Sequence, residues 1–313
     1  MVLKTMFRAS AALALAMLPV QGFAQEAEPV AATAPAAAPT ATQDADPALW
    51  VLRDADTTIY LFGTVHFLKP GLSWFDEAVR EAFDRSDELV LEMVQPDKSE
   101  MTAKVVEYAV ATSGPSLREK LSDDYRETLE TVLDDLGQPK QSFDRVEPWF
   151  ATMTLAVLPL VIKYGYDPES GAEYVLTETA TREGKTISGL ETVDQQLGFF
   201  DSIPEALQIA YLEALLDNYA DLGTSLEKVV RQWAAGNSGN LGALMNENMR
   251  ETPGIASWLL VKRNQNWANW IDDRMDRPGT VFVAVGAGHL AGDDSVQNFL
   301  SREHGLTATR VEY

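Results

Sequence analysis

Two segments near opposite ends of the chain share one order of features: an apolar strand, a glycine, a histidine three residues after the glycine, a helix and a second strand. The first begins with the strand 57–62 (TTIYLF) and continues with residues 63–66 (GTVH). The second begins with the strand 280–285 (TVFVAV) and continues with residues 286–289 (GAGH). This order favours an α/β fold whose parallel strands are joined by right-handed crossovers.

The rest of the first unit is predicted to be a helix and a strand. Ser73 is expected to cap the helix, with Asp76 three residues later and an apolar face between Trp74 and Phe83. Residues 88–93 (ELVLEM) then form the second strand.

The last unit follows the same plan. Asp293 or Asp294 is expected to cap a helix that continues through Arg302, and Gly305 is expected to end it. Residues 306–312 form the last strand.

The chain between the two units is predicted to be mainly helical. Residues 98–183 and 204–276 contain amphipathic stretches, and one further strand, 185–190 (KTISGL), lies between them. We therefore predict a single α/β domain. It has a central mostly parallel or mixed sheet, two β-GxxH-α-β units and large helical insertions.

The N-terminus has the pattern of an exported protein. Residues 1–24 resemble a secretory signal peptide, with Lys4 and Arg8 before an apolar run and a small-x-small cleavage site that ends at Ala24. Residues 25–46 are rich in alanine and proline, as flexible linkers are, and residues 47–313 form the domain. We expect a periplasmic or secreted protein without stable membrane insertion once the signal is removed.

The charge and the lack of cysteine restrict the possible partners and the source of stability. The formal charge is −22, or −24 once Lys4 and Arg8 are removed, which argues against nucleic acid and anionic membrane surfaces as partners. The acidity is adequately explained by solubility and selects no substrate. The chain contains no cysteine, so an exported protein of this sequence must be held by its core.

Two of the three histidines lie in the GxxH units. A glycine at the carboxyl end of a strand lets the backbone approach a ligand closely, and ligands bind at these ends of parallel sheets. His66 and His289 are therefore expected at one functional edge, although partly buried histidines that bond to loop carbonyls would show the same pattern. His304 lies in the last turn of a helix, where compensation of the helix dipole explains it.

Two glutamates also follow predicted strands. Glu92 lies near the end of 88–93, and Glu191 directly follows 185–190. If these strands share one sheet, the two carboxylates can converge with His66 and His289. Two imidazoles with one or two carboxylates suit Zn²⁺, Mn²⁺, Co²⁺ or Fe²⁺, and without a metal the same groups can act as general acid and base. Each glutamate could instead be a helix cap or belong to a surface ion pair.

One helix carries a further candidate. Arg263, in the helix VKRNQNWANWIDD, could orient a substrate carbonyl or stabilise a tetrahedral intermediate, or it could form a surface ion pair. Trp258, Trp267 and Trp270 are expected to be core residues. The chain contains no Walker loop, nucleophile elbow or HExxH motif, so these signatures give no support for a nucleotidase, a serine hydrolase or a gluzincin.

From about Pro47 to the C-terminus the chain resembles the TraB/GumN family, which is related to the Tiki metalloproteases. The resemblance rests on five motifs in the family order: PALWVLRDADTTIYLFGTVHFL, SDELVLEM, GKTISGLET, LLVKRNQNW and VFVAVGAGHLAG. It implies an α/β fold and a metal-dependent peptidase that uses Mn²⁺ or Co²⁺. By position, His66 and His289 match the GxxH histidines, Glu92 and Glu191 match the glutamates, and Arg263 matches the arginine of the RN pair. The wider superfamily is thought to include esterases and haem-binding proteins.

The leading hypothesis is an exported metal-dependent hydrolase that cleaves a peptide or another envelope substrate. His66, Glu92, Glu191 and His289 would hold Mn²⁺, Co²⁺ or Zn²⁺, a glutamate would act as base, and Arg263 would polarise the carbonyl. The alternatives are a non-catalytic envelope protein that binds metal, haem or glycan, a metal-free acid/base esterase, and an inactive scaffold for polysaccharide export. The sequence does not predict the oligomeric state.

Overall fold

The computed structural model describes residues 42–250 and 254–313. The predicted signal 1–24 and most of the predicted linker lie outside the described residues. Strand β1 (Gln43–Asp44) pairs in parallel with β4 (Leu72–Ser73), and Ala45 is buried. The folded chain therefore includes the last residues of the range that we predicted as linker.

The main sheet has six strands in the order β6-β5-β7-β3-β2-β8. Strands β6, β5, β7 and β3 run parallel, whereas β2 is antiparallel to both β3 and β8. The predicted α/β domain with a mixed sheet is confirmed. The strands are β2 (Leu49–Arg53), β3 (Thr57–Thr64), β5 (Glu88–Met93), β6 (Thr186–Glu191), β7 (Gly279–Gly286) and β8 (Thr309–Arg310).

The two predicted units interleave in this sheet. The first strand of the last unit, β7, lies between β3 and β5, the two strands of the first unit. The register of β3 with β7 pairs Gly63 with Val285 and Thr64 with Gly286. The two GxxH segments consequently leave neighbouring parallel strands at the same edge of the sheet.

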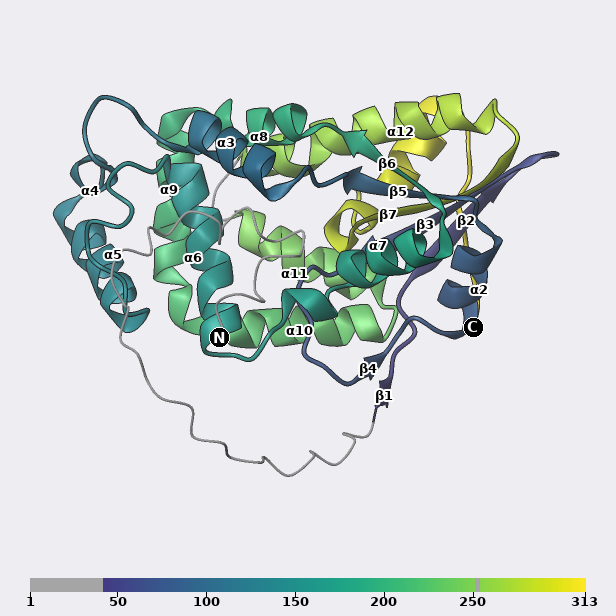
Figure 1. Ribbon diagram of the computed structural model, residues 1–313, viewed down its shortest axis with the longest axis horizontal. Coiled ribbons are helices and arrows are strands. Elements are labelled where there is room, and N and C mark those ends of the chain that lie inside the picture. Colours follow the sequence, from purple (N-terminus) through teal and green to yellow (C-terminus); the bar gives the residue numbers. More distant parts are fainter. Residues whose placement is uncertain (1–41, 251–253) are drawn as a thin grey trace.

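Helices lie on both faces of the sheet and beyond one end of it. Figure 1 shows the sheet at one end of the molecule and α4, α5, α6 and α9 at the other. The helices are α2 (Glu77–Arg85), α3 (Lys98–Ala109), α4 (Leu117–Lys120), α5 (Asp123–Asp135), α6 (Pro148–Ile162), α7 (Ala172–Glu183), α8 (Val193–Asp201), α9 (Glu205–Asp217), α10 (Leu222–Ala234), α11 (Ser238–Arg250), α12 (Lys262–Met275) and α13 (Val296–Phe299), with π-helical turns η4 (Ser257–Val261) and η6 (Leu300–His304). No helix within the described ranges is long and apolar enough to cross a membrane.

The predicted start of the first-unit helix is wrong. The N-cap of α2 is Asp76, because Ser73 is already paired in the small sheet and donates its hydroxyl hydrogen bond to the Asp76 carboxylate. Trp74 and Phe75, which we placed on the helix, precede it.

The predicted start of the last helix is also wrong. Ser295, and neither of the two preceding aspartates, is the N-cap of α13, and the helix continues as η6 to His304. Gly305 ends it in a left-handed conformation with φ +69°, as predicted. The last strand is limited to the two residues of β8.

Alternate residues of the central strands enter two cores. Tyr60 and Phe62 of β3 pack in a cluster with residues of α2, α7 and α10, whereas Ile59 and Leu61 pack with α12 and α13. Strand β7 alternates in the same way. A sheet that is covered on both faces explains the nearly continuous apolar runs in these strands.

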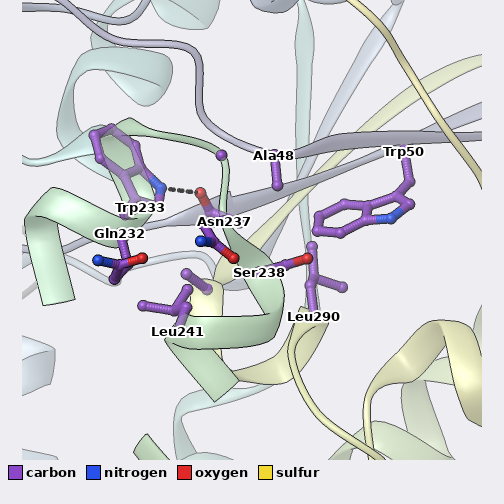
Figure 2. A pocket seen from close by; sticks show the side chains of 11 residues that line it. Ala48, Trp50, Gln232, Trp233, Asn237, Ser238, Leu241 and Leu290 are labelled. Carbon is purple, nitrogen blue, oxygen red and sulfur yellow. Dashed lines mark hydrogen bonds between the residues drawn. The ribbon is translucent and has the colours of Figure 1, made fainter. Parts of the chain in front are cut away.

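Helix α10 supports the end of β3, where the first GxxH segment begins. Pairing of β2 with β3 reaches Phe62 and stops, and the Gly63 carbonyl beyond it accepts a hydrogen bond of 2.7 Å from Nε1 of Trp233. Figure 2 shows this bond beside a small cavity that Trp50 also lines. The indole therefore satisfies a buried carbonyl at the start of the first GxxH segment.

Replacement of Trp233 tests this support. Trp233→Phe leaves a buried carbonyl without its donor, so we expect the free energy of unfolding to fall by about 1 to 3 kcal/mol more than in a matched Trp50→Phe variant. The indole of Trp50 makes no hydrogen bond within the described chain. Urea denaturation of both variants measures the difference, and equal losses would contradict the role of the hydrogen bond.

Candidate functional site

His66 is held by a carboxylate that the sequence analysis missed. Its Nδ1 lies 2.7 Å from Oε1 of Glu173, which is 6% exposed in the first turn of α7, and the Thr64 hydroxyl donates to the same oxygen. The other oxygen, Oε2, is buried without a hydrogen-bond partner in the described chain. In the sequence, Glu173 is an acidic residue at the start of a helix, where compensation of the helix dipole explains it. No sequence pattern therefore indicated that it belongs to the site.

The ion pair determines the preferred charge of His66. The Glu173 carboxylate raises the pKa of His66 to about 9, against the opposing effect of burial. Solvent reaches the His66 side chain, which is 50% exposed, and screens the pair.

Gly171 allows α7 to approach the first GxxH segment. A Cβ atom at this position would lie 2.0 Å from the backbone oxygen of His66 and 2.7 Å from its carbonyl carbon. Its φ is −63°, so close packing and not backbone strain requires the glycine. This contact places Glu173, two residues later, beside the imidazole.

The glycines of both GxxH segments also allow close packing within the protein. The Gly286 N–H donates to Oε1 of Glu92 at 2.7 Å, and a Cβ at Gly286 would meet the same oxygen at 3.1 Å. A Cβ at Gly63 would lie 3.1 Å from Cα of Ala287. We had expected these glycines to make room for a ligand, whereas here they make room for a carboxylate and for each other's segment.

Arg263 joins the two strand-end glutamates and lies inside the protein. Its Nε and Nη2 donate to Oε1 and Oε2 of Glu191 at 2.8 Å each, and Nη2 also donates to Oε2 of Glu92 at 2.8 Å. Arg263 and Glu191 are 6% and 8% exposed. The alternative of a helix-surface ion pair is therefore wrong for Arg263.

The two carboxylates differ in their protonation chemistry. Burial opposes the ionisation of Glu92, but the Arg263 guanidinium, the neighbouring imidazoles and the Gly286 N–H together hold its pKa well below its usual range. Burial raises the pKa of Glu191 despite its contacts with Arg263. Glu92 is thus the firmly anionic carboxylate of the pair.

His289 is neutral and has a defined tautomer. Its Nδ1 lies 2.5 Å from Oδ1 of Asn264, an acceptor, so Nδ1 carries the proton and Nε2 the lone pair. Burial lowers the pKa of His289 to about 3. Nε2 lies 3.7 Å from Oε1 of Glu92 and 3.4 Å from Nη1 of Arg263.

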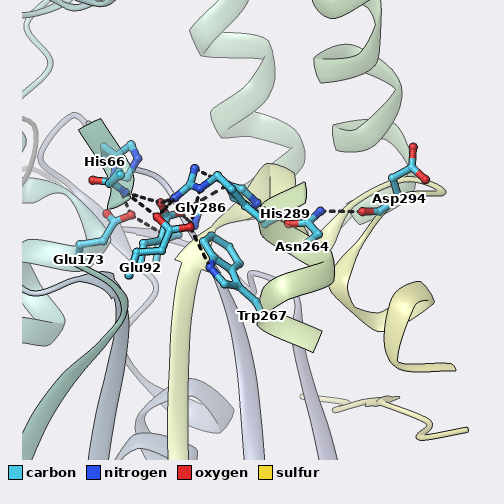
Figure 3. Close-up of polar contacts among 12 residues, drawn as sticks. His66, Glu92, Glu173, Asn264, Trp267, Gly286, His289 and Asp294 are labelled. Atoms are coloured by element: carbon cyan, nitrogen blue, oxygen red, sulfur yellow. Dashed lines mark hydrogen bonds and ion pairs between the residues drawn. The ribbon is translucent and has the colours of Figure 1, made fainter. Parts of the chain in front are cut away.

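Trp267 belongs to both the core and the site. Its ring centroid lies 4.3 Å from that of His289, and its Nε1 donates to Oε1 of Glu191 at 3.0 Å. Figure 3 shows the polar contacts as one chain from His66 and Glu173 to Asn264 and Asp294. Trp258, by contrast, is partly exposed, with the Lys262 ammonium 3.5 Å from its ring centroid.

A cavity of about 390 Å³ lies over this cluster. His66, Glu92, Arg263 and His289 line it together with Glu173. Glu191 is absent from the lining and lies behind Arg263. Within residues 42–250 and 254–313, no three histidine, aspartate or glutamate side chains lie close enough together to hold a metal ion without moving.

His304 lies outside the cavity. It pairs with Asp272 at 2.9 Å and contacts Asn269 at 3.0 Å.

The fold and this pocket define an α/β protein with histidine, glutamate and arginine side chains at the carboxyl ends of parallel strands. The model of the TraB/PrgY/gumN family matches residues 48–310, so the chain belongs to that family. A protein from Treponema pallidum (strain Nichols), described as uncharacterized, is 24% identical over 268 residues, which cover 81% of this chain and 80% of the relative. No solved structure matches the chain.

Gly171→Ala tests the packing that places Glu173. The added methyl group would overlap the His66 carbonyl, so we expect the free energy of unfolding to fall by about 1 to 3 kcal/mol. Gly198→Ala is the matched control, because nothing lies within 4 Å of its added Cβ in the interior of α8. That variant should gain about 0.5 to 1 kcal/mol. Equal effects in urea denaturation would contradict the close approach.

The pKa of His66 can be measured by NMR in the metal-free mature protein. We expect it to be raised from 6.5 toward about 9, and to return toward 6.5 in Glu173→Gln. Because the pKa of His66 is raised in the folded state, the pairing of protonated His66 with Glu173 stabilises the fold fully below pH 6.5. This contribution is lost as the pH rises through 9. The stability advantage of the wild type over Glu173→Gln should shrink across that window. A His66 pKa that Glu173→Gln leaves unchanged would contradict the ion pair.

Proposed function

We propose that this protein is an exported hydrolase in which His66, His289 and Glu92 hold a divalent metal ion. The manner in which both histidines are held carries the proposal. Nδ1 of His66 faces Glu173 and Nδ1 of His289 faces Asn264. Nε2 of His66 is therefore left for a ligand, and Nε2 of His289 would exchange its 3.4 Å contact with Nη1 of Arg263 for a ligand. Metal-binding histidines commonly have their second ring nitrogen bound to a protein oxygen in this way.

The donor types fit Mn²⁺, Co²⁺ or Zn²⁺, because two imidazoles and one anionic carboxylate form a common site for these ions. Both oxygens of Glu191 already accept hydrogen bonds, from Arg263 and Trp267, so we assign Glu191 to the positioning of Arg263. Metal binding would require His66, Glu92 and His289 to move closer together.

The groups of the chain suit hydrolysis of a carbonyl compound. A bound metal would supply an activated water and polarise the carbonyl. Nη1 of Arg263 contacts His289 at 3.4 Å and donates to no carboxylate in the described chain, so it can donate to the oxygen that becomes negative. Because both ring nitrogens of His66 would be engaged, by the metal and by Glu173, a glutamate has to transfer the proton, and Glu173 lines the cavity with Oε2 lacking a hydrogen-bond partner in the described chain. A peptide is the substrate that the family resemblance favours.

The position of Arg263 favours a second candidate, a metal-free acid/base hydrolase. A guanidinium between Glu92 and His289 already supplies positive charge to the site. His66, which Glu173 orients and whose pKa it raises to about 9, then has the arrangement of a general acid and its orienting carboxylate.

Metal analysis separates these candidates. We expect mature protein expressed with Mn²⁺, Co²⁺ or Zn²⁺ to contain about one metal ion per chain by elemental analysis, and a chelator to abolish cleavage of a peptide library. His289→Ala should lose metal affinity and turnover by at least about 100-fold, because loss of a ligand costs more than loss of its hydrogen-bond partner. His304→Ala is the control and should retain both.

The other outcomes are equally informative. Turnover by metal-free protein that a chelator leaves unchanged would support the acid/base hydrolase. Protein that binds metal, haem or glycan without cleaving any library member would contradict both hydrolase proposals and support a binding role.

A further inference from the structure

The cavity over the site has one polar end and apolar walls. His66, Glu92, Arg263 and His289 form the polar end. The walls come from separate elements, namely β5, α6, α8, α10 and η4, and from the segment after β3. Their lining residues include Phe67, Met93, Met153, Val157, Phe200 and Leu226.

The exposure of these wall residues indicates a ligand surface. Met93, Met153 and Val157 are only partly buried, although each packs against a buried apolar cluster. Contiguous apolar surface in a concave site is typical of small-molecule binding, and 390 Å³ lies within the usual range for such cavities. Methionine side chains adapt their shape, so the walls can accept chains of different form.

We infer that the substrate carries an apolar chain next to the bond that is cleaved, and that this chain lies against α6, α8 and α10. The inference rests on the proposed hydrolase function. The apolar walls are continuous with the polar end in one cavity, so a substrate whose carbonyl meets Arg263 and His289 must place its neighbouring atoms against them. The chain is either a large apolar side chain of a peptide or a fatty acyl group.

Two buried polar atoms indicate that the ligand also has polar groups. Nε2 of Gln95 and Oε2 of Glu173 have no hydrogen-bond partner in the described chain, and both residues line the cavity. A substrate amide can satisfy both atoms, because its carbonyl oxygen accepts and its N–H donates, whereas an ester can only accept from Gln95.

Binding of neutral amides measures the apolar contact without turnover. For the mature protein we expect affinity by calorimetry to rise from acetamide to butanamide to octanamide, by roughly fourfold for each methylene group that is fully buried. N-acetyl-leucinamide should bind more tightly than N-acetyl-glycinamide by a comparable factor per carbon.

Two matched variants locate the contact. Met153→Glu places a carboxylate on the wall and should weaken octanamide binding by at least about tenfold. Val106→Glu adds the same charge on α3 at a residue that is 48% exposed and outside the cavity lining, and should leave binding unchanged. Both variants should unfold cooperatively in urea. Equal affinity for acetamide and octanamide, or an equal effect of both variants, would overturn the inference.

Hydrolysis distinguishes the source of the chain and separates the two proposals. A kcat/KM that rises with acyl length in p-nitrophenyl esters supports a fatty acyl substrate, and a kcat/KM that rises from glycine to leucine or phenylalanine in peptides supports a peptide side chain. A kcat/KM that does not change with chain length or side-chain size would overturn the inference but would still support the proposed hydrolase function. Binding that follows chain length without any hydrolysis would support the apolar contact and contradict the hydrolase.

Discussion

The guanidinium of Arg263 joins elements that lie far apart in the sequence. It comes from α12 and binds carboxylates at the ends of β5 and β6, the two strands at one side of the sheet. Each buried carboxylate would be costly without a partner, and removal of one member of such a group commonly costs about 3 to 5 kcal/mol. The two strand ends and the helix that covers them are therefore held together by a buried polar contact in addition to apolar packing.

The same contact explains the charge of the site. One guanidinium faces two carboxylates, and further N–H donors from Gly286, Trp267 and Gln196 share the excess negative charge. Glu173 adds a third carboxylate, beside His66. The polar end can therefore accept positive charge, from a proton on His66 or from a cation. This balance is the physical reason that metal binding and acid/base catalysis are both reasonable for one set of side chains.

Local sequence patterns predicted the individual strands and helices of this fold but not which of them lie next to each other. The strands, the helical insertions, and the placement of Glu92 and Glu191 at strand ends follow from apolar runs and glycines that lie within a few residues of one another. The insertion of β7 between β3 and β5 depends on pairing between segments that lie roughly two hundred residues apart, which no local pattern records. Gly171 and Glu173 could not be predicted for a related reason. The role of each residue depends on a contact with His66, which lies about a hundred residues earlier in the chain.

The position of β7 determines when the site can form during folding. The second GxxH segment reaches the first only after β7 has entered between β3 and β5, and all of the helical insertions precede it in the chain. Such distant pairing has a high entropic cost before its contacts form, so the central sheet is expected to be completed late. The helices that form the apolar walls contain mostly local contacts and can form earlier. The site is thus expected to assemble when β7 pairs with β3 and β5 between helices that have already formed. Each group of the site therefore depends on the folding of the whole domain.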